Sequence, residues 1–320
     1  MGYIIKTVFK SGKFRFGFTA LSLIIMIVIF FPIFNKTDPM RMDGRMFERP
    51  NLFEYMQGTH DIKNEKVVTA EEQAISDMLA QWGIVVQEKE SMNTLRVLGT
   101  DNFGRDVLSQ LVAATRTSLL IGLMAGTIAT LIGITIGLTA GYMGGTTDNI
   151  LASVINIVIV IPSIVILILI SISLKTRGFT TIAFIIGITS WPWTARSVRA
   201  QTTSLRNRDH VNLSKLSGHS MPRIIVKDIL PYLASYVVMA FILQVASAIL
   251  AEASLSMLGL GPHNVASLGL MMSWAMNFNA LANGAWWAFL PVVGTIALIH
   301  FSLNLINSGL DQIFNPQIRS

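Results

Sequence analysis

The chain has 320 residues, of which 52% are hydrophobic and 13% charged, and its formal net charge is +6. Soluble domains carry about 25% charged residues, so the composition indicates a membrane protein and excludes an ordinary soluble enzyme. The excess positive charge lies mainly at the N-terminus and in one loop between apolar runs, as the positive-inside rule predicts. No aromatic residues alternate with basic ones as in a stacking platform, so nucleic-acid binding is excluded. The absence of cysteine excludes a disulfide framework and thiol chemistry.

Residues 1–35 are predicted to form a cytoplasmic tail and a first membrane helix. Basic residues precede an apolar run from Phe16 to Phe34, which at about 1.5 Å per residue is long enough to cross the hydrocarbon core. The run is longer than the core of a signal peptide, and no A-x-A-like cleavage site is evident. We therefore expect an uncleaved helix whose N-terminus lies in the cytoplasm.

Residues 36–116 are polar and mixed in charge, and by alternation they lie outside the membrane. Segment 70–86 has helical apolar spacing through Ile75, Met78 and Leu79, so this external loop is predicted to be partly helical. The segment is either a packed helix within the loop or a contact surface for a substrate-delivery protein.

The end of this loop is predicted to form a structural elbow that fixes the entry angle of the next helix. Thr100 or Asp101 is expected to cap a short helix whose first turn includes Asp106. Arg105 is expected to pair with a nearby carboxylate. Direct contact of Asp101, Arg105 and Asp106 with a substrate is the alternative.

Residues 117–309 are predicted to form the core of an all-α polytopic membrane protein. One span carries Gly122-x-x-x-Gly126 and, further on, Gly133-x-x-x-Gly137-x-x-x-Gly141, which place small residues on one stripe for close helix packing. Together with the first helix this core contains six membrane helices, and residues 310–320 then form a cytoplasmic tail. The spans expected after the first are 117–142, 150–174, 179–198, 231–249 and 286–304.

Three residues inside the spans are candidates for either a gate or a structural role. Pro162 and Pro192 each leave a backbone carbonyl unpaired, which allows a helix to bend. Glu252 is the only acidic residue embedded in an apolar segment, and an intramembrane carboxylate is a functional candidate. Its partner is expected to be a nearby hydroxyl or backbone amide. Asp148 is expected to cap the third span, and the lone His300 is expected to be a packing residue.

Residues 206–232 form a basic, polar interruption between two apolar runs, which places them on the cytoplasmic side. Asp209 or Asn212 is expected to cap a short helix here, and Gly218 to end it. Pro231 is expected to break or bend the chain where the next span begins. A short helix held at the membrane face is suited to docking a soluble partner.

Several of these segments resemble the permeases of ABC importers. Segment 99–118 is similar to G-T-D-x-x-G-R-D-V-F-S-R-x-x-x-G-A-R-x-S of the C-type permeases in the dipeptide, oligopeptide and nickel importers, and segment 252–261 is similar to E-A-x-L-S-F-L-G-L-G. The basic loop keeps the Asp, Val and Gly of the family's coupling loop but has Asn-Leu-Ser where the family has Glu-Ala-Ala. The resemblance implies that coupling loop 200–230 and the proline after it contact an ATPase through Arg208, Asp209, Val211, Asn212, Leu213, Ser214, Lys215, Gly218, Arg223 and Pro231.

The resemblance also implies a type I ABC-importer permease fold with six membrane helices in a prokaryotic cytoplasmic membrane. The implied partners are a homologous B-type permease, two ABC ATPase subunits and an external solute-binding protein. ATP and magnesium would bind the ATPases, because this chain has no P-loop: its Gly12-Lys13 pair is followed by Phe14. No metal or other cofactor is expected in this chain. The implied cargo is a di- or oligopeptide, with oligosaccharides or nickel complexes as alternatives.

Two other classes of function are less compatible with the residues. An intramembrane enzyme needs a nucleophile and a base that meet inside the membrane, whereas this chain has no cysteine and His300 follows no serine-containing elbow. An ion-coupled secondary transporter usually shows internal repeats and several buried charges, whereas Glu252 stands alone. The sequence therefore favours a transport subunit without catalytic residues of its own.

Overall fold

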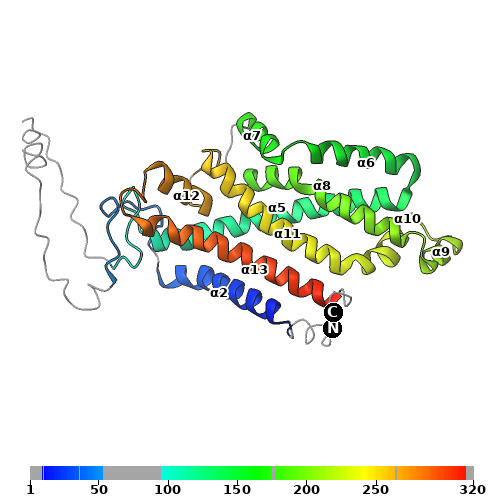
Figure 1. The fold of residues 1–320 in the computed structure, drawn as a ribbon, viewed down its shortest axis with the longest axis horizontal. Coiled ribbons are helices and arrows are strands. Elements are labelled where there is room, and N and C mark those ends of the chain that lie inside the picture. The colour runs from blue at the N-terminus through cyan, green and yellow to red at the C-terminus, as the bar shows by residue number, and fades with distance from the viewer. Residues whose placement is uncertain are drawn as a thin grey trace, which may run out of the picture.

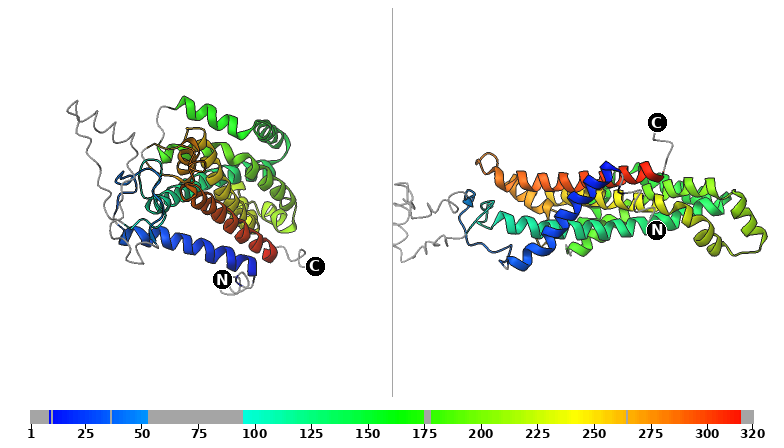
Figure 2. Two further views of the ribbon diagram at one scale, coloured as in Figure 1. Left: turned by 60° about the vertical axis from the view of Figure 1, so that its left-hand side comes forward. Right: turned by 90° about the horizontal axis from the view of Figure 1, so that it is seen from below.

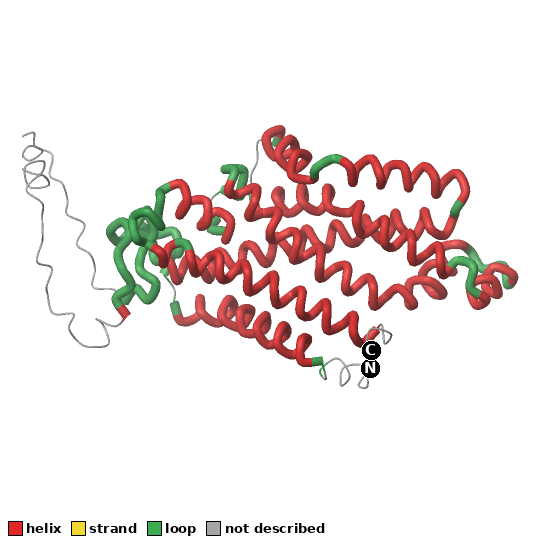
Figure 3. Tube along the Cα trace, viewed as in Figure 1, coloured by secondary structure: helices red, strands yellow, loops and turns green. Residues whose placement is uncertain are grey.

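The computed structural model describes residues 9, 11–35, 37–52, 95–174, 178–263 and 265–314. Apart from one isolated antiparallel bridge between Thr100 and Asp106, the regular structure of these residues is helical (Figure 3). The helix expected within 70–86 lies outside the described residues. The elements are α2 (Gly12–Phe34), α5 (Val107–Met143), α6 (Gly145–Val160), α7 (Ser163–Ser173), α8 (Phe179–Leu205), α9 (Asp209–Leu216), α10 (Met221–Ile224), the π-helical turn η1 (Ile225–Ile229), α11 (Leu230–Met257), α12 (Leu268–Asn277), the 3-10 turn η2 (Trp286–Ala288) and α13 (Leu290–Phe314).

The long helices form an elongated bundle with two different ends (Figure 1). Helices α9 and α10 project from one end, which we call the α9 end. Segments 37–52 and 95–106 and helix α12 gather at the other, which we call the elbow end. The polar and irregular segments thus lie at the two ends of the bundle, as expected for a protein whose middle part crosses a membrane.

Among the described residues, four helical segments are long and apolar enough to cross a membrane: α2, α5, the continuous stretch Met221–Met257, and Trp286–Ile313. Helices α6 and α7 are apolar enough when taken together, but they are bent by 84° at the break between them. They are a fifth span only if the pair is counted as one broken span. Helix α8 is long but less apolar, with Arg196 and Arg199 near its end, and it falls outside this set. The expected number of six membrane helices therefore stays a prediction.

The observed helix boundaries differ from the expected ones where a polar contact or a proline intervenes. The second span begins earlier than expected, at Val107, because the Asp106 side chain accepts a hydrogen bond from the backbone N–H of Ser109 and caps α5. The third span was expected to be continuous through Pro162, but α6 ends at Val160 and α7 begins at Ser163. A proline lacks the N–H that would continue the helix, and here the chain turns sharply rather than bending gently.

Helix α5 is the central element, and its glycines are the points of closest approach to its neighbours. Gly122 and Gly126 lie against Ile249 and Val245 of α11, and Gly133, Gly137 and Gly141 lie against α8. A Cβ on Gly137 would come within 2.7 Å of the backbone oxygen of Ala195. The glycine stripe is thus occupied by two neighbouring helices, so it serves packing.

Helix α2 crosses α13 obliquely, again through small residues (Figure 2). Gly17 of α2 lies against the backbone of Ser302, and Gly309 of α13 lies against Phe14. The first span is therefore attached to the last one by close backbone contact at two positions.

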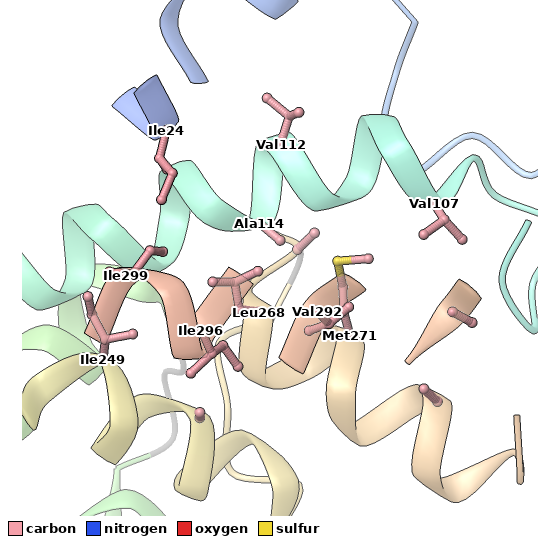
Figure 4. Close-up of a cluster of buried hydrophobic side chains, with 14 of the residues drawn as sticks. Ile24, Val107, Val112, Ala114, Ile249, Leu268, Met271, Val292, Ile296 and Ile299 are labelled. Atoms are coloured by element: carbon pink, nitrogen blue, oxygen red, sulfur yellow. The ribbon is translucent and has the colours of Figure 1, made fainter. Parts of the chain in front are cut away.

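The largest apolar core lies toward the elbow end and joins α2, α5, α11, α12 and α13. Figure 4 shows Val107 of α5 pointing toward the side on which Met271 of α12 and Val292 of α13 lie, whereas Val112 points to the opposite side of α5. A separate, smaller cluster lies near the α9 end and contains Leu138, Val198, Val211, Ile224, Ile229 and Leu233. This smaller cluster attaches α9 to the bundle.

The close approach of α5 and α8 leads to a test with matched variants. Gly137→Ala is expected to destabilise the protein by about 1–3 kcal/mol, because the added methyl meets backbone that cannot move without separating the helices. Gly294→Ala in α13 is the control, since nothing lies within 4 Å of the added atom and alanine favours a helix by up to about 1 kcal/mol. Thermal unfolding of the purified protein in detergent measures both effects. Equal midpoints for the two variants would contradict this packing.

Candidate functional site

Helix α9 is short and is defined by backbone contacts at both of its ends. It was expected to be capped by Asp209 or Asn212, but the N-cap residue is Arg208, whose carbonyl accepts hydrogen bonds from the N–H groups of Val211 and Asn212 at 3.0 Å. Asp209 instead occupies the first turn, where a negative charge favours the helix N-terminus. Gly218 has a φ of +72°, the left-handed conformation that glycine adopts at little cost and that ends a helix.

The two faces of α9 differ sharply in exposure. Val211 is fully buried in the small core at this end of the bundle. Leu213 and Leu216 are 66% and 85% exposed, and with Asp209 they share one face because residues three and four apart are neighbours on a helix. The chain thus holds α9 by one buried valine and presents two leucines at the tip.

From Met221 onward the chain is continuously helical into α11 and shows no break at Pro231. A break or bend was expected there, but Pro231 lies in the first turn of α11, where its missing N–H is least disruptive. The preceding turn η1 has the wider π-helical geometry, which shifts the hydrogen-bond register before the proline. The His210 ring stacks on Tyr232 with centroids 4.7 Å apart, so α9 also contacts the start of α11. Arg223, in α10, is exposed.

The elbow contains a buried ion pair. Arg105 Nη2 lies 2.6 Å from Asp101 Oδ2, and the side chains are only 2% and 8% exposed. Asp101 also accepts hydrogen bonds from Arg105 Nε at 2.8 Å and from Gln110 Nε2 at 2.9 Å. The Arg105 guanidinium lies over the rings of Phe103 and Trp274, 4.4 Å and 4.1 Å from their centroids.

These elbow contacts join segments that are distant in sequence. The Thr100 hydroxyl donates to the carbonyl of Arg45 at 2.6 Å, and the Thr100 carbonyl accepts from Trp287 Nε1 at 3.1 Å. Asp106 caps α5 from the same turn. A guanidinium as buried as that of Arg105 has almost no surface for a solute, so its geometry favours the structural interpretation over substrate contact.

Glu252 is fully buried and is surrounded by hydroxyl groups. Its carboxylate accepts from the hydroxyls of Ser256 at 2.7 Å, Ser267 at 2.6 Å and Ser118 at 3.1 Å. The Ser118 oxygen in turn accepts from the N–H of Leu268 at 3.0 Å. The carboxylate thus joins α5, α11 and the start of α12.

Pro162 and Pro192 lie at a different place, where they line one cavity of about 610 Å³. The walls come from α6, the break before α7, α8, α11 and α13. Polar groups from three helices reach this cavity: Ser190 and Thr194 of α8, Gln244 of α11, and Asn307 and Asp311 of α13. Glu252 does not line it, so the three residues grouped as gate candidates fall into two separate sites.

Gln244 also lines this cavity and was not predicted as a site residue. Its Nε2 donates to Thr194 Oγ1 at 2.7 Å and to the Ser190 carbonyl at 2.9 Å, on the turn of α8 that contains Pro192. An uncharged amide in an apolar run gives only a weak signal in the sequence. Gln244 lies next to Pro192 only because α8 and α11 pack together, and the sequence does not show that packing.

The part of the chain that the structure describes contains no group of three or more His, Cys, Asp or Glu side chains that could hold a metal ion. The buried carboxylates are matched by hydroxyls, amides or arginine, as described for Glu252 and Asp101. Each of these two clusters joins residues of different elements.

Comparison with known proteins places the chain among bacterial transport proteins. Residues 133–320 match the family described as binding-protein-dependent transport system inner membrane component. The oligopeptide transport system permease protein OppC of Bacillus subtilis is 32% identical over 69% of this chain and 72% of its own length. The dipeptide transport system permease protein DppC of the same organism is 35% identical over 69% and 68%.

OppC of Mycobacterium tuberculosis is 35% identical over 70% of this chain and 76% of its own length. A solved structure of the MetNI methionine ABC transporter in an inward-facing conformation has 18% identity and a TM-score of 0.49, covering 63% of this chain and 97% of that one. The family match spans more than half of the chain, and the relatives exceed 30% identity over more than two thirds of it. The chain therefore belongs to the binding-protein-dependent transport system inner membrane components and is a multi-pass transport subunit rather than an enzyme.

Proposed function

We propose that this chain is one of two homologous permease subunits of an ATP-driven importer for di- and oligopeptides. Peptide transport is supported by the names of the relatives, which are oligopeptide and dipeptide permeases. The proposal that an ATPase supplies the energy rests on the geometry of α9, which presents Leu213 and Leu216 to solvent at one end of the bundle (Figure 1). In this proposal the α9 end faces the cytoplasm, both termini are cytoplasmic, and the membrane is the plasma membrane of a prokaryote.

Docking of an ATPase subunit on α9 follows from what that helix exposes. Fully burying a leucine side chain contributes about 1.5–3 kcal/mol, so covering Leu213 and Leu216 is a substantial driving force for association. Arg208 and Lys215 flank this apolar tip and would favour an acidic rim on the partner. Val211 then connects the docked helix to the core of the membrane bundle.

The remaining components of the importer follow from the same proposal. ATP and magnesium are held by two ATPase subunits, and an external solute-binding protein delivers the cargo to the elbow end. The second permease completes the path beside the cavity lined by Pro162 and Pro192, and Glu252 has a structural role away from this path. Closure of the ATPases favours one conformation of the permease pair through its differential contacts with α9.

The docking proposal predicts the effect of placing a charge on the exposed face of α9. Leu213→Glu and Leu216→Glu are each expected to lower the amount of ATPase that co-purifies with the permease by about tenfold or more, because a buried contact then carries an unpaired carboxylate. Leu281→Glu is the matched control, since Leu281 is 52% exposed in a turn at the elbow end. Equal retention of the ATPase by all three variants would show that α9 is not the docking element.

The cargo and the energy source are tested together in vesicles that contain the complete complex and its solute-binding protein. Uptake of a labelled tripeptide is expected to require ATP and to cease when the ATPase subunits carry an inactivating substitution. An excess of unlabelled peptide is expected to compete, whereas an oligosaccharide or a nickel complex is not. Uptake driven by an ion gradient with inactive ATPase would assign the protein to the secondary transporters instead.

A further inference from the structure

A series of polar contacts leads from α9 to the beginning of α6. Lys215 of α9 donates from Nζ to the carbonyl of Arg206 at 3.0 Å and lies 5.6 Å from the centroid of the Tyr142 ring. Arg206 is the residue at which α8 ends. The helix proposed to dock the ATPase is therefore attached by a side chain to the end of α8 and to the end of α5.

Arg206 continues this series to the turn between α5 and α6. Its guanidinium occupies the space beside Gly144 that a Cβ would take. Gly144 ends α5 and begins α6, and its φ of +67° is one that glycine adopts readily. A Cβ at this position would meet the end of the Arg206 side chain, which would then have to move aside.

Asp148 closes the series. It was expected to cap α6, but it lies inside the first turn, and its two carboxylate oxygens accept from Arg199 of α8, through Nε to Oδ1 and through Nη2 to Oδ2 at 2.8 Å. A paired arrangement of this kind fixes the direction as well as the distance between the groups. The first turn of α6 is thereby held to α8 one to two turns before Arg206.

Helix α6 has few other attachments to the bundle. Among its residues only Ile155 is buried, and the side chains of Ile150, Ile157 and Val160 are exposed. Its far end meets the break at Ile161 and Pro162, where the chain turns by 84° and lines the cavity. Helix α6 therefore connects its first turn, which contains Asp148, to the cavity wall.

We propose that the Asp148–Arg199 pair, supported by Arg206, is the positioning contact through which movement of α9 reaches the cavity wall. This inference rests on the proposed function, because it requires an ATPase that moves α9. The pair joins α8, whose last turn lies beside α9, to α6, whose other end lines the cavity. Its side chains are partly exposed, at 18% for Asp148 and 33% for Arg199, so the contact can rearrange in water without the cost of opening a core.

The test measures how many peptides enter per ATP hydrolysed in vesicles containing the complete complex. Asp148→Asn is expected to lower this ratio by about fivefold or more, the lower range of typical coupling between sites, while ATPase subunits stay bound and hydrolyse ATP. Asp148→Glu keeps the charge and is expected to restore most of the ratio. The double exchange Asp148→Arg with Arg199→Asp is expected to give more uptake per ATP hydrolysed than either Asp148→Arg or Arg199→Asp alone.

The matched control is Asp43→Asn at the elbow end. Asp43 is 19% exposed and pairs with Arg41 and Arg96, so its removal breaks a comparable contact that does not lie between α9 and the cavity. It is expected to change the yield of complex but not the ratio of uptake to hydrolysis. A merely structural role for Asp148 would give the same pattern as Asp43.

The outcomes separate this inference from the proposed function. If the unaltered complex takes up peptide at the expense of ATP and Asp148→Asn leaves the ratio unchanged, the positioning role is wrong and the proposed function stands. If Asp148→Asn lowers the ratio and Asp43→Asn does not, the positioning role is supported. If the unaltered complex shows no ATP-dependent uptake, the proposed function fails and this inference fails with it.

Discussion

The close approach of α5 to α8 and α11 is the constraint on which the other contacts depend. Inside a bilayer there is no hydrophobic force between helices, because lipid tails are as apolar as leucine, so association relies on close packing and on satisfied polar groups. Gly126 and Gly137 bring the backbones near enough for both. A wider spacing between α5 and α11 would separate Ser118 from Glu252, and a shift of α8 would separate Gln244 from Thr194. The glycines therefore set the geometry in which the buried polar side chains find partners.

Those polar side chains in turn make the arrangement specific. A buried polar group without a partner costs several kcal/mol in an apolar medium, so an alternative packing that separates such a pair is disfavoured. Glu252 connects α11 to α5 and to the start of α12, and Gln244 connects α11 to the turn of α8 that contains Pro192. Close packing alone tolerates small rotations of a helix, whereas these directed bonds do not. Packing and hydrogen bonding thus act on the same helix pairs.

The sequence allowed prediction of features that depend on composition and local chemistry. The apolar runs located the long helices, and Gly218 marked the end of α9, because both signals are local. Contacts between residues that are distant in the chain were harder to predict. Asp148 was expected to be a helix cap, but it lies in the first turn of α6 and its partner Arg199 lies 51 residues further along the chain. Pro162 indicated a bend, whereas the chain breaks there and turns by 84° between α6 and α7. Gln244 gave only a weak signal, since its contacts exist only because α11 lies beside α8.

The two ends of the bundle differ in how strongly their ionic contacts are held, and this difference suits the proposed mechanism. The Arg105–Asp101 pair is almost fully buried, with aromatic rings against the guanidinium, and removing one partner of such a pair typically costs about 3–5 kcal/mol. The Asp148–Arg199 pair is partly solvated, and exposed pairs contribute only about 0–1 kcal/mol. In the proposed mechanism a movement of α9 is passed along α6 to the cavity wall. Because a packed core does not deform continuously, the structure then rearranges where contacts are weak and helices are interrupted. Those places are the first turn of α6, the break at Pro162 and the turn η1, all of them away from the elbow.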